Sequence, residues 1–304
     1  MRIAITGANS SVGQNLLAQI AEEPEFRAIA GVRSEKAMAC LPESPRISPQ
    51  IISYDDIDQL VGVFEGADCV VHLAGILIES KHSNYASANV AATATVVAAA
   101  QRIKAKHFVF ISVIGANDAS SNPYFRSKGS AEKLVQISGI SASIIRTPIL
   151  LGPETAGAIA LRGSAAQAKA KVLGGGHYSM RPLDIDDLCQ AILNCCRRDD
   201  KAANIYELAG PEPIPYRDLI KRTAKLMGHE TEIASIPICP AKLAAAISSR
   251  IKGGGMTPAV IDVITSDEVV KSNADEKLGI SLTPLQTTLE KIINQKLSSW
   301  QIKT

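Results

Sequence analysis

The sequence predicts an α/β fold in which a doubly wound parallel sheet carries a smaller C-terminal lobe. Short apolar runs alternate with helix-like segments from Met1 to about Pro148, and this alternation is typical of parallel strands joined by crossover helices. The first run also enters a turn of small residues and then a segment with helical apolar spacing. We therefore expect strands at residues 2–6, 26–32, 50–53, 69–73, 106–112 and 141–146.

Helical spacing of apolar residues fills most of the gaps between these strands, and the clearest segments are residues 12–22, 84–102 and 123–138. Residues 156–176 are rich in Ala and Gly and predict a helix that ends in a turn of three glycines. With 304 residues and a hydrophobic content of 46%, the chain is long enough to bury one large core together with a smaller lobe.

The charge pattern favours a small-molecule partner. The 32 basic and 30 acidic residues are interspersed and give a net charge of +2, so no basic stripe is present for nucleic acid or an anionic membrane. No stretch reaches the ~20 apolar residues that span a bilayer, and the chain begins with a strand rather than a cationic leader. We expect a cytoplasmic protein. The six cysteines form no C-x-x-C pair and have no His at ligand spacing, so no metal site is expected.

The small-residue turn at the start of the chain predicts a phosphate cradle. A strand that runs into a helix N-terminus presents free backbone N–H groups and a helix dipole, and both favour an anion. Gly7 allows the tight turn and Gly13 lets the helix pack closely on the strand, while Ser10 stands where a middle glycine is usual. The residues expected to hold a pyrophosphate are Gly7, Asn9, Ser10, Ser11, Val12 and Gly13.

A candidate catalytic pair lies on the helix predicted at residues 123–138. Tyr124 and Lys128 are four residues apart and project from one helix face, so we expect the ammonium to lower the pKa of the phenol. A tyrosine tuned in this way is a proton donor and acceptor. Ser112 ends the apolar run before this helix and is expected to hold a substrate oxygen. The alternative is an ordinary surface pair of Tyr and Lys.

Several segments resemble the short-chain dehydrogenase/reductase superfamily, in the same order along the chain. Residues 6–13 resemble the T-G-x-x-G-x-x-G fingerprint of its extended and atypical members, residues 69–75 its fourth strand, and residues 89–93 its N-x-x-x-T segment. Residues 181–187 and 206–211 resemble its late R-P-x-x-V-x-D segment and the strand that follows. The likeness covers nearly the whole chain.

This resemblance implies a dinucleotide-binding Rossmann domain at residues 1–150, with segments returning from about residues 180–210. Most of residues 151–304 would form a substrate-side lobe that is intermixed with the Rossmann body. Asn89 is expected either near the nicotinamide or as an ordinary residue of the helix N-terminus. The residues implied to contact the cofactor outside the glycine turn are Leu73, Ala74, Gly75, Asn89, Lys128 and Pro148.

The residues that follow the second and third predicted strands bear on cofactor binding. An acidic residue after the second strand binds the adenine ribose of NAD, whereas a basic residue suits the extra phosphate of NADP. Arg33 follows the strand here, which favours NADP over NAD, unless Arg33 stacks on the adenine or faces solvent. Asp55 or Asp56 resembles the aspartate that meets the adenine amino group, and both could instead be helix caps.

The substrate is less well defined. Nucleotide-sugar epimerases and dehydratases usually have an asparagine where this chain has Ile149, and an apolar side chain cannot replace the amide contacts with a sugar diphosphate. Arg181 could bind an anionic substrate group or form an ion pair with Asp184 or Asp187, and His177 is a further candidate contact. Relatives often form dimers through the two long helices, so a homodimer is possible.

The resemblance leaves three functions open. The first is an NADP-dependent oxidoreductase or epimerase that transfers hydride to or from a small carbonyl or hydroxyl compound, with Tyr124, Lys128 and Ser112 as the catalytic residues. The second is a nucleotide-binding assembly or sensor protein without turnover, because the atypical branch includes an accessory subunit of respiratory complex I. The third is a nucleotide-sugar epimerase or dehydratase.

Overall fold

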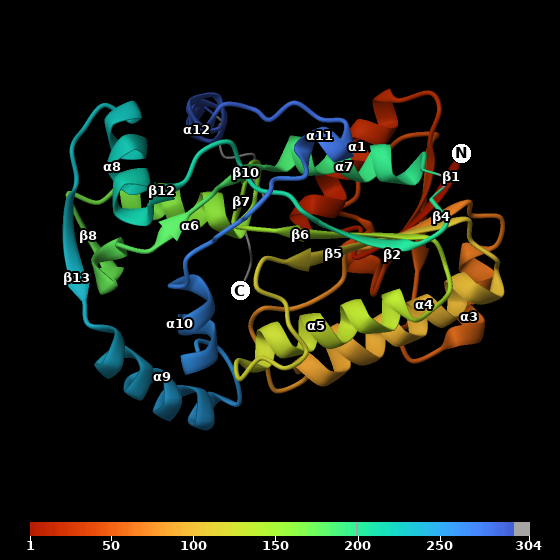
Figure 1. Ribbon diagram of the computed structural model, residues 1–304, viewed down its shortest axis with the longest axis horizontal. Helices are drawn as coiled ribbons and strands as arrows, with labels where there is room; N and C mark the ends of the chain where they lie inside the picture. Colours follow the sequence, from red (N-terminus) through yellow and green to blue (C-terminus); the bar gives the residue numbers. More distant parts are fainter. Residues whose placement is uncertain (199, 295–304) are drawn as a thin grey trace.

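The computed structural model describes residues 1–198 and 200–294, and its largest element is a seven-stranded sheet (Figure 1). All neighbouring strands run parallel, in the order β11-β6-β5-β4-β1-β2-β3. This arrangement confirms the predicted doubly wound sheet and is the Rossmann order of strands. The strands are β1 (Arg2–Thr6), β2 (Arg27–Val32), β3 (Ile47–Ile51), β4 (Cys69–His72), β5 (His107–Val113), β6 (Ala142–Thr147) and β11 (Ala203–Glu207).

Helices cover both faces of this sheet (Figure 1). Side chains at odd and even positions of the buried strands point to opposite faces, so each face has its own apolar core. Ile5 and Val109 pack toward the helices of one face, and Phe108 and Phe110 toward those of the other. The helices are α1 (Ser11–Glu22) and α7 (Ile185–Cys196) on the first face, and α3 (Ile57–Phe64), α4 (Ala92–Arg102) and α5 (Pro123–Gln136) on the second.

A smaller lobe follows the sixth strand and lies to the left in Figure 1. Its own core brings together Leu161, Leu219 and Leu289 from three helices. The chain also returns to the large sheet, because α7 packs against α1 and β11 pairs with β6. The elements of this lobe include β7 (Leu150–Leu151), α6 (Ala156–Ala165), β8 (Lys169–Leu173), β9 (Ser179–Met180), β10 (Leu183–Asp184), β12 (Ile214–Pro215), α8 (Tyr216–Leu226), β13 (Glu232–Ile236), α9 (Ile238–Lys252), α10 (Pro258–Ile264) and α12 (Leu285–Asn294).

Three details of the predicted elements are wrong. Residues 156–176 were expected to be helix and turn, but β8 lies in their second half, where the buried Ala170 and Val172 alternate with the exposed Lys169 and Lys171. The helix expected at residues 84–102 begins with a π-helix, Ala86–Ala91, before α4. The third strand starts earlier than expected, at Ile47, and its Pro49 is tolerated because β3 is an edge strand.

No helix in residues 1–198 or 200–294 is both long enough and apolar enough to cross a bilayer. The same residues contain no group of His, Cys, Asp and Glu side chains that could hold a metal ion.

Candidate functional site

The turn between β1 and α1 is packed so closely that two of its positions require glycine. Gly7 has φ +71, and a Cβ atom there would lie 3.0 Å from the backbone nitrogen of Ala74. A Cβ atom on Gly13 would lie 2.5 Å from the carbonyl oxygen of Ala8. Ser10 caps α1, because its hydroxyl accepts a hydrogen bond from the Gly13 amide at 3.0 Å. The turn is therefore fixed against the loop after β4 on one side and α1 on the other.

The N-terminus of α1 is suited to an anion. Among the described residues, no group accepts a hydrogen bond from the backbone amides of Ser11 and Val12. The first turn of the helix contains no acidic side chain that would oppose a negative ligand. Free amides at the positive end of a helix dipole are the features that bind phosphate groups. The turn thus fits the pyrophosphate of a dinucleotide.

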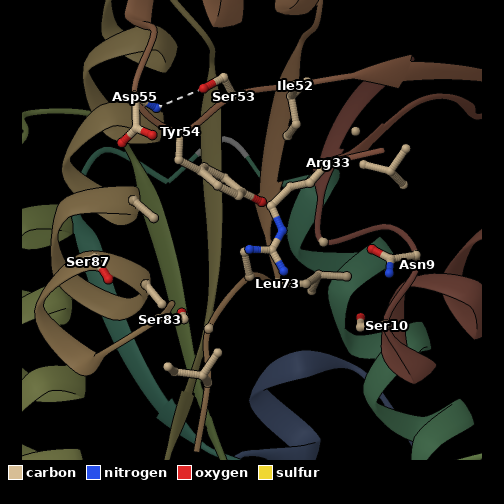
Figure 2. Close-up of a pocket in the computed structure, with 18 of the residues that line it drawn as sticks. Asn9, Ser10, Arg33, Ile52, Ser53, Tyr54, Asp55, Leu73, Ser83 and Ser87 are labelled. Atoms are coloured by element: carbon tan, nitrogen blue, oxygen red, sulfur yellow. Dashed lines mark hydrogen bonds between the residues drawn. The ribbon is translucent and has the colours of Figure 1, made fainter. Parts of the chain in front are cut away.

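A polar cavity of about 600 Å³ opens above this turn (Figure 2). Asn9 and Ser10 lie at one end, Ser53 and Asp55 lie at the other, and Arg33 lies between them. Ser11, Val12 and Gly13 lie behind the cavity lining, in the first turn of α1. The predicted cofactor residues that line the cavity are Gly7, Asn9, Ser10, Arg33, Asp55, Leu73, Ala74 and Gly75.

At the far end of this cavity, the structure gives Asp55 and Asp56 different positions. It also adds Tyr54, which the sequence did not indicate. Asp56 caps α3 through the Gln59 amide at 2.9 Å, whereas Asp55 lines the cavity. Figure 2 shows Tyr54 and Arg33 pointing toward one another across the cavity. Burial raises the pKa of Tyr54, and the positive charge of Arg33 acts in the opposite direction. Tyr54 therefore stays neutral beside a cation.

The π-helix ahead of α4 brings Asn89 into the interior. Its side-chain oxygen accepts a hydrogen bond from the Ile76 amide at 2.8 Å, and its nitrogen donates to the Ile76 carbonyl and to the Ser127 hydroxyl, both at 3.0 Å. Asn89 thus ties the loop after β4 to α5. Single π-turns are frequent at functional sites, where they reorient one side chain.

Lys128 is buried beside the same loop. Its ammonium donates to the Ile111 carbonyl at 2.8 Å and lies 4.3 Å from the centre of the Phe110 ring. The nitrogen would also be 3.8 Å from a Cβ atom on Gly75, which lines the polar cavity. Burial lowers the pKa of Lys128 to about 8, although Glu132 opposes this shift. The ammonium of Lys128 is therefore held at the edge of the polar cavity, where burial costs it solvation free energy.

Tyr124 lies one helical turn before Lys128 and is also buried. Its ring centre is 5.7 Å from that of Tyr85. Burial raises the pKa of Tyr124, and Tyr85 adds to the increase. The expected lowering of this pKa by Lys128 is wrong, because burial and Tyr85 both act to raise it.

A second cavity of about 400 Å³ lies on the other side of the loop after β4. Tyr124 and Leu77 line it from the large domain, and so do Val113, Thr147 and Pro148 at the carboxyl ends of β5 and β6. The carboxyl ends of parallel strands are the usual place for ligands in this type of sheet. Aromatic and aliphatic side chains of the smaller lobe complete the wall, among them Tyr178, Met180, Tyr216 and Ile264.

Ser112 does not face this cavity. Ser112 pairs with Arg146 across β5 and β6, and Arg146 binds Glu132 of α5 at 2.7 Å, so both residues lie on the α5 side of the sheet. Val113 and Thr147 form the next pair, and both line the cavity. The Ser112 hydroxyl is buried and has no hydrogen-bond partner among the described residues. The structure therefore brings Tyr124 and Lys128 together, and Val113 faces the cavity in place of Ser112.

The two predicted substrate contacts are not among the residues that line the second cavity. Arg181 donates from Nε to the Gly210 carbonyl at 2.9 Å. The alternative ion pair of Arg181 does not form, because Asp184 binds Lys291 at 2.7 Å and Asp187 accepts hydrogen bonds from Thr283. His177 lies 3.0 Å from a guanidinium nitrogen of Arg217 in the smaller lobe.

The parallel sheet, the glycine turn and the polar cavity above it define an NAD(P)-binding protein of the extended short-chain dehydrogenase/reductase type. The chain belongs to the family described as NAD(P)H-binding, whose family model matches residues 7–174. The match covers the glycine turn that follows β1, strands β2 to β6 and both Tyr124 and Lys128.

Relatives of known description are distant but nearly full-length. The chain is 23% identical over 273 residues to 4-hydroxy-2-methyl-3-oxo-4-farnesyl-3,4-dihydroquinoline-1-oxide ketoreductase of Stigmatella aurantiaca, covering 83% of this chain and 80% of the relative. It is 22% identical to the mitochondrial NADH dehydrogenase [ubiquinone] 1 alpha subcomplex subunit 9 of Arabidopsis thaliana, covering 92% and 73% of the two chains. The crystal structure of Citrobacter sp. triphenylmethane reductase complexed with NADP(H) matches 95% of this chain and 99% of its own, with a TM-score of 0.75 and 19% identity. This last likeness shows a shared fold.

Proposed function

We propose that the protein is an NADP-dependent reductase of small carbonyl compounds in which Tyr124 supplies the proton. The observation that supports this function is the position of Tyr124 and Lys128 between the two cavities. Tyr124 lines the apolar cavity, and Lys128 lies against Gly75 at the edge of the polar one. A substrate oxygen beside Tyr124 would then be close to the ammonium of Lys128 and to the polar cavity.

The chemistry divides between the cofactor and the chain. A bound nicotinamide supplies hydride to the carbonyl carbon, and the protein supplies the proton for the carbonyl oxygen. The raised pKa of Tyr124 keeps the phenol protonated at neutral pH, which is the form that donates in the direction of reduction. The ammonium of Lys128 would stabilise the negative charge that develops on the phenol and the substrate oxygen. Asn89 holds the loop after β4 in place.

The preference for NADP rests on Arg33. Its guanidinium projects into the polar cavity from the end of β2 (Figure 2). A bidentate cation at this point suits a phosphate group on the adenine ribose. The neighbouring cavity wall offers Ser53 and Tyr54 but no acidic residue directly after β2, where a ribose hydroxyl would need one.

Replacement of Tyr124 by Phe tests the proposal. Loss of the phenol hydroxyl should reduce substrate-dependent oxidation of NADPH by about 10²- to 10⁴-fold, the usual contribution of a general acid, and leave NADPH affinity unchanged. The matched control is Tyr178→Phe, which removes a hydroxyl from the same cavity and should retain most of the activity. Equal activity of the wild type and Tyr124→Phe would refute the catalytic role.

One observation favours a second function, nucleotide binding without turnover. Val113 faces the cavity where a hydroxyl was expected to hold the substrate oxygen, so that part of the predicted catalytic set is absent from the cavity. The relative from Arabidopsis thaliana is named as a subunit of an NADH dehydrogenase rather than as a separate enzyme. Tight NADPH binding by both the wild type and Tyr124→Phe, with no carbonyl-dependent oxidation by either, would support this alternative.

A further inference from the structure

We infer that the second cavity takes an uncharged carbonyl compound with an alkyl or aromatic body, and that it excludes nucleotide sugars and other phosphorylated substrates. The inference rests on the proposed function for the catalytic step, but it concerns the binding of the substrate body and can be tested by binding alone.

The wall of the cavity is mainly apolar where it meets Tyr124. Val113, Ile149 and Leu77 come from the strand ends and the loop of the large domain, and Phe125 follows Tyr124 on α5. From the other lobe, Met180 and Ile264 face the same space. A ligand that displaces water from such a surface gains affinity from its own apolar area.

The smaller lobe also provides a flat aromatic wall. The rings of Tyr178 and Tyr216 are stacked, with centres 5.6 Å apart and an interplanar angle of 17°. Burial raises the pKa of both phenols, so neither is a phenolate at neutral pH. Rings held in this way offer a rigid surface to an apolar chain or to another ring.

No cationic side chain is available in this cavity to meet a phosphate. Within the described part of the chain, its lining contains no Lys, Arg or His. It contains two acidic residues, Asp267 and Glu268, whose carboxylates accept hydrogen bonds from the Ser179 amide at 2.7 Å and from the Ile149 and Arg181 amides at 2.6 and 2.8 Å. Burial raises the pKa of Glu268 to about 7, so this carboxyl group is only partly charged at neutral pH. A diphosphate would still find no counter-ion in this lining, and this lack discriminates against such a ligand.

The space available to the substrate body depends on small residues of α6. Ala156, Gly157 and Ala160 line the cavity from this helix. Gly157 is fixed by close packing, because a Cβ atom there would lie 2.6 Å from the Leu150 carbonyl. Ala160 is exposed, so a larger side chain has room at this position. Phe at position 160 would therefore fill part of the cavity without disturbing the core.

The test compares two ketones of equal chain length, 2-nonanone and 8-oxononanoate, together with UDP-glucose. Binding is measured by calorimetry on the full-length protein saturated with NADP⁺, so that the cofactor side is filled. We expect 2-nonanone to bind at least ten-fold more tightly than 8-oxononanoate and UDP-glucose not to bind. Ala160→Phe should weaken 2-nonanone binding at least ten-fold, whereas Ile159→Phe, at an exposed position of the same helix that does not line the cavity, should not change it.

Three outcomes would overturn the inference: equal binding of the two ketones, binding of UDP-glucose, or no binding of 2-nonanone and of the uncharged dye Nile red. The proposed catalysis is tested separately. If 2-nonanone binds as expected but Tyr124→Phe and the wild type oxidise NADPH equally, the reductase proposal fails and the cavity assignment stands. If an anionic carbonyl compound is reduced in a Tyr124-dependent way, the cavity assignment fails and the reductase proposal stands.

Discussion

The two cavities on either side of the loop after β4 are built in opposite ways. The polar cavity is formed by backbone and small residues around Gly7 and Gly75, and its shape is fixed by close contacts between β1, β4 and α1. Most of the wall of the apolar cavity is formed by aliphatic and aromatic side chains, and it runs from Leu77 to Glu268 across both lobes. In the function proposed above, the polar cavity holds the cofactor, and backbone geometry forms much of its wall near the turn. The other is shaped by side chains, which can vary without altering the fold.

The boundary of the family match agrees with this contrast. Residues 7–174 include the whole glycine turn and the strand ends of the polar cavity. Tyr178, Tyr216 and Glu268 of the apolar cavity lie beyond that range. The family match therefore includes the whole lining of the polar cavity but only part of the lining of the apolar one.

The contrast predicts that a methyl group added at Gly13 weakens binding in the polar cavity and leaves binding in the apolar cavity unchanged. Gly13→Ala places a Cβ atom 2.5 Å from the Ala8 carbonyl oxygen. The backbone fixes the positions of both atoms, so neither can move away easily. We expect NADPH affinity to fall about 100-fold, because overpacking of about 3 kcal/mol distorts the turn. Calorimetric titration with NADPH and thermal unfolding would measure the loss, while Nile red binding to the apolar cavity should persist.

Gly163→Ala is the matched control in the other lobe. Gly163 also lies in a helix, α6, but a Cβ atom there has no neighbour within 4 Å. The change should stabilise the protein by about 0.5–1 kcal/mol, since alanine is the better helix former. If Gly13→Ala bound NADPH as well as Gly163→Ala does, the close packing of the turn would not matter for the cofactor.

Lys128 lies between the cavities, and the second prediction concerns its solvation. Its pKa of about 8 is below the ordinary 10.5, so between these values the unfolded chain binds the proton and the folded chain does not. The stability contributed at this site therefore rises with pH across that window. Lys128→Met removes the titration, and we expect its advantage in free energy of unfolding over the wild type to shrink by about 2 kcal/mol between pH 7.5 and 9.5.

Urea unfolding of the cofactor-free proteins at the two pH values would measure this difference. All other titrating groups are common to both proteins and cancel in the comparison. A difference that does not change with pH would mean that Lys128 is not a desolvated cation. The expected result would show that the buried ammonium of Lys128 lowers stability, as is usual for a residue kept for function.

The fold and the cofactor side could be predicted from the sequence because their signals are local. The strand, turn and helix at Gly7 to Gly13 follow one another along the chain, and each residue type has a direct physical reason there. The positions of Tyr124 and Lys128 on one helix face follow from helix geometry alone. Asp55 and Asp56 could not be separated, because either one satisfies a helix cap and only the fold shows that Asp56 does so.

The substrate side could not be predicted in the same way. The hydroxyl of Ser112 suggests a contact with a substrate oxygen. Strand alternation instead places Ser112 with Phe108 and Phe110, on the face that packs against α5. Counting that alternation would have indicated Val113 instead. The pKa of Tyr124 depends on its burial and on the nearby Tyr85, and no local sequence pattern shows either. The wall formed by Tyr178 and Tyr216 joins residues far apart in sequence.

Arg33 provides the smallest expected effect and the sharpest test of the polar cavity. If its guanidinium binds the extra phosphate of NADPH, Arg33→Ala should weaken NADPH binding about 10- to 30-fold, because Arg33 is exposed and its bond to a charged group should contribute near the lower end of about 1.5–3 kcal/mol. Binding of NADH should change less than about three-fold, since that cofactor has no phosphate at this point. Lys36→Ala, an exposed change on the adjacent helix α2 (Glu35–Met38) outside the cavity lining, controls for loss of net positive charge. An equal loss for both cofactors would show that Arg33 stacks on the adenine instead, and tighter binding of NADH than NADPH by the wild type would reverse the assignment of the cofactor.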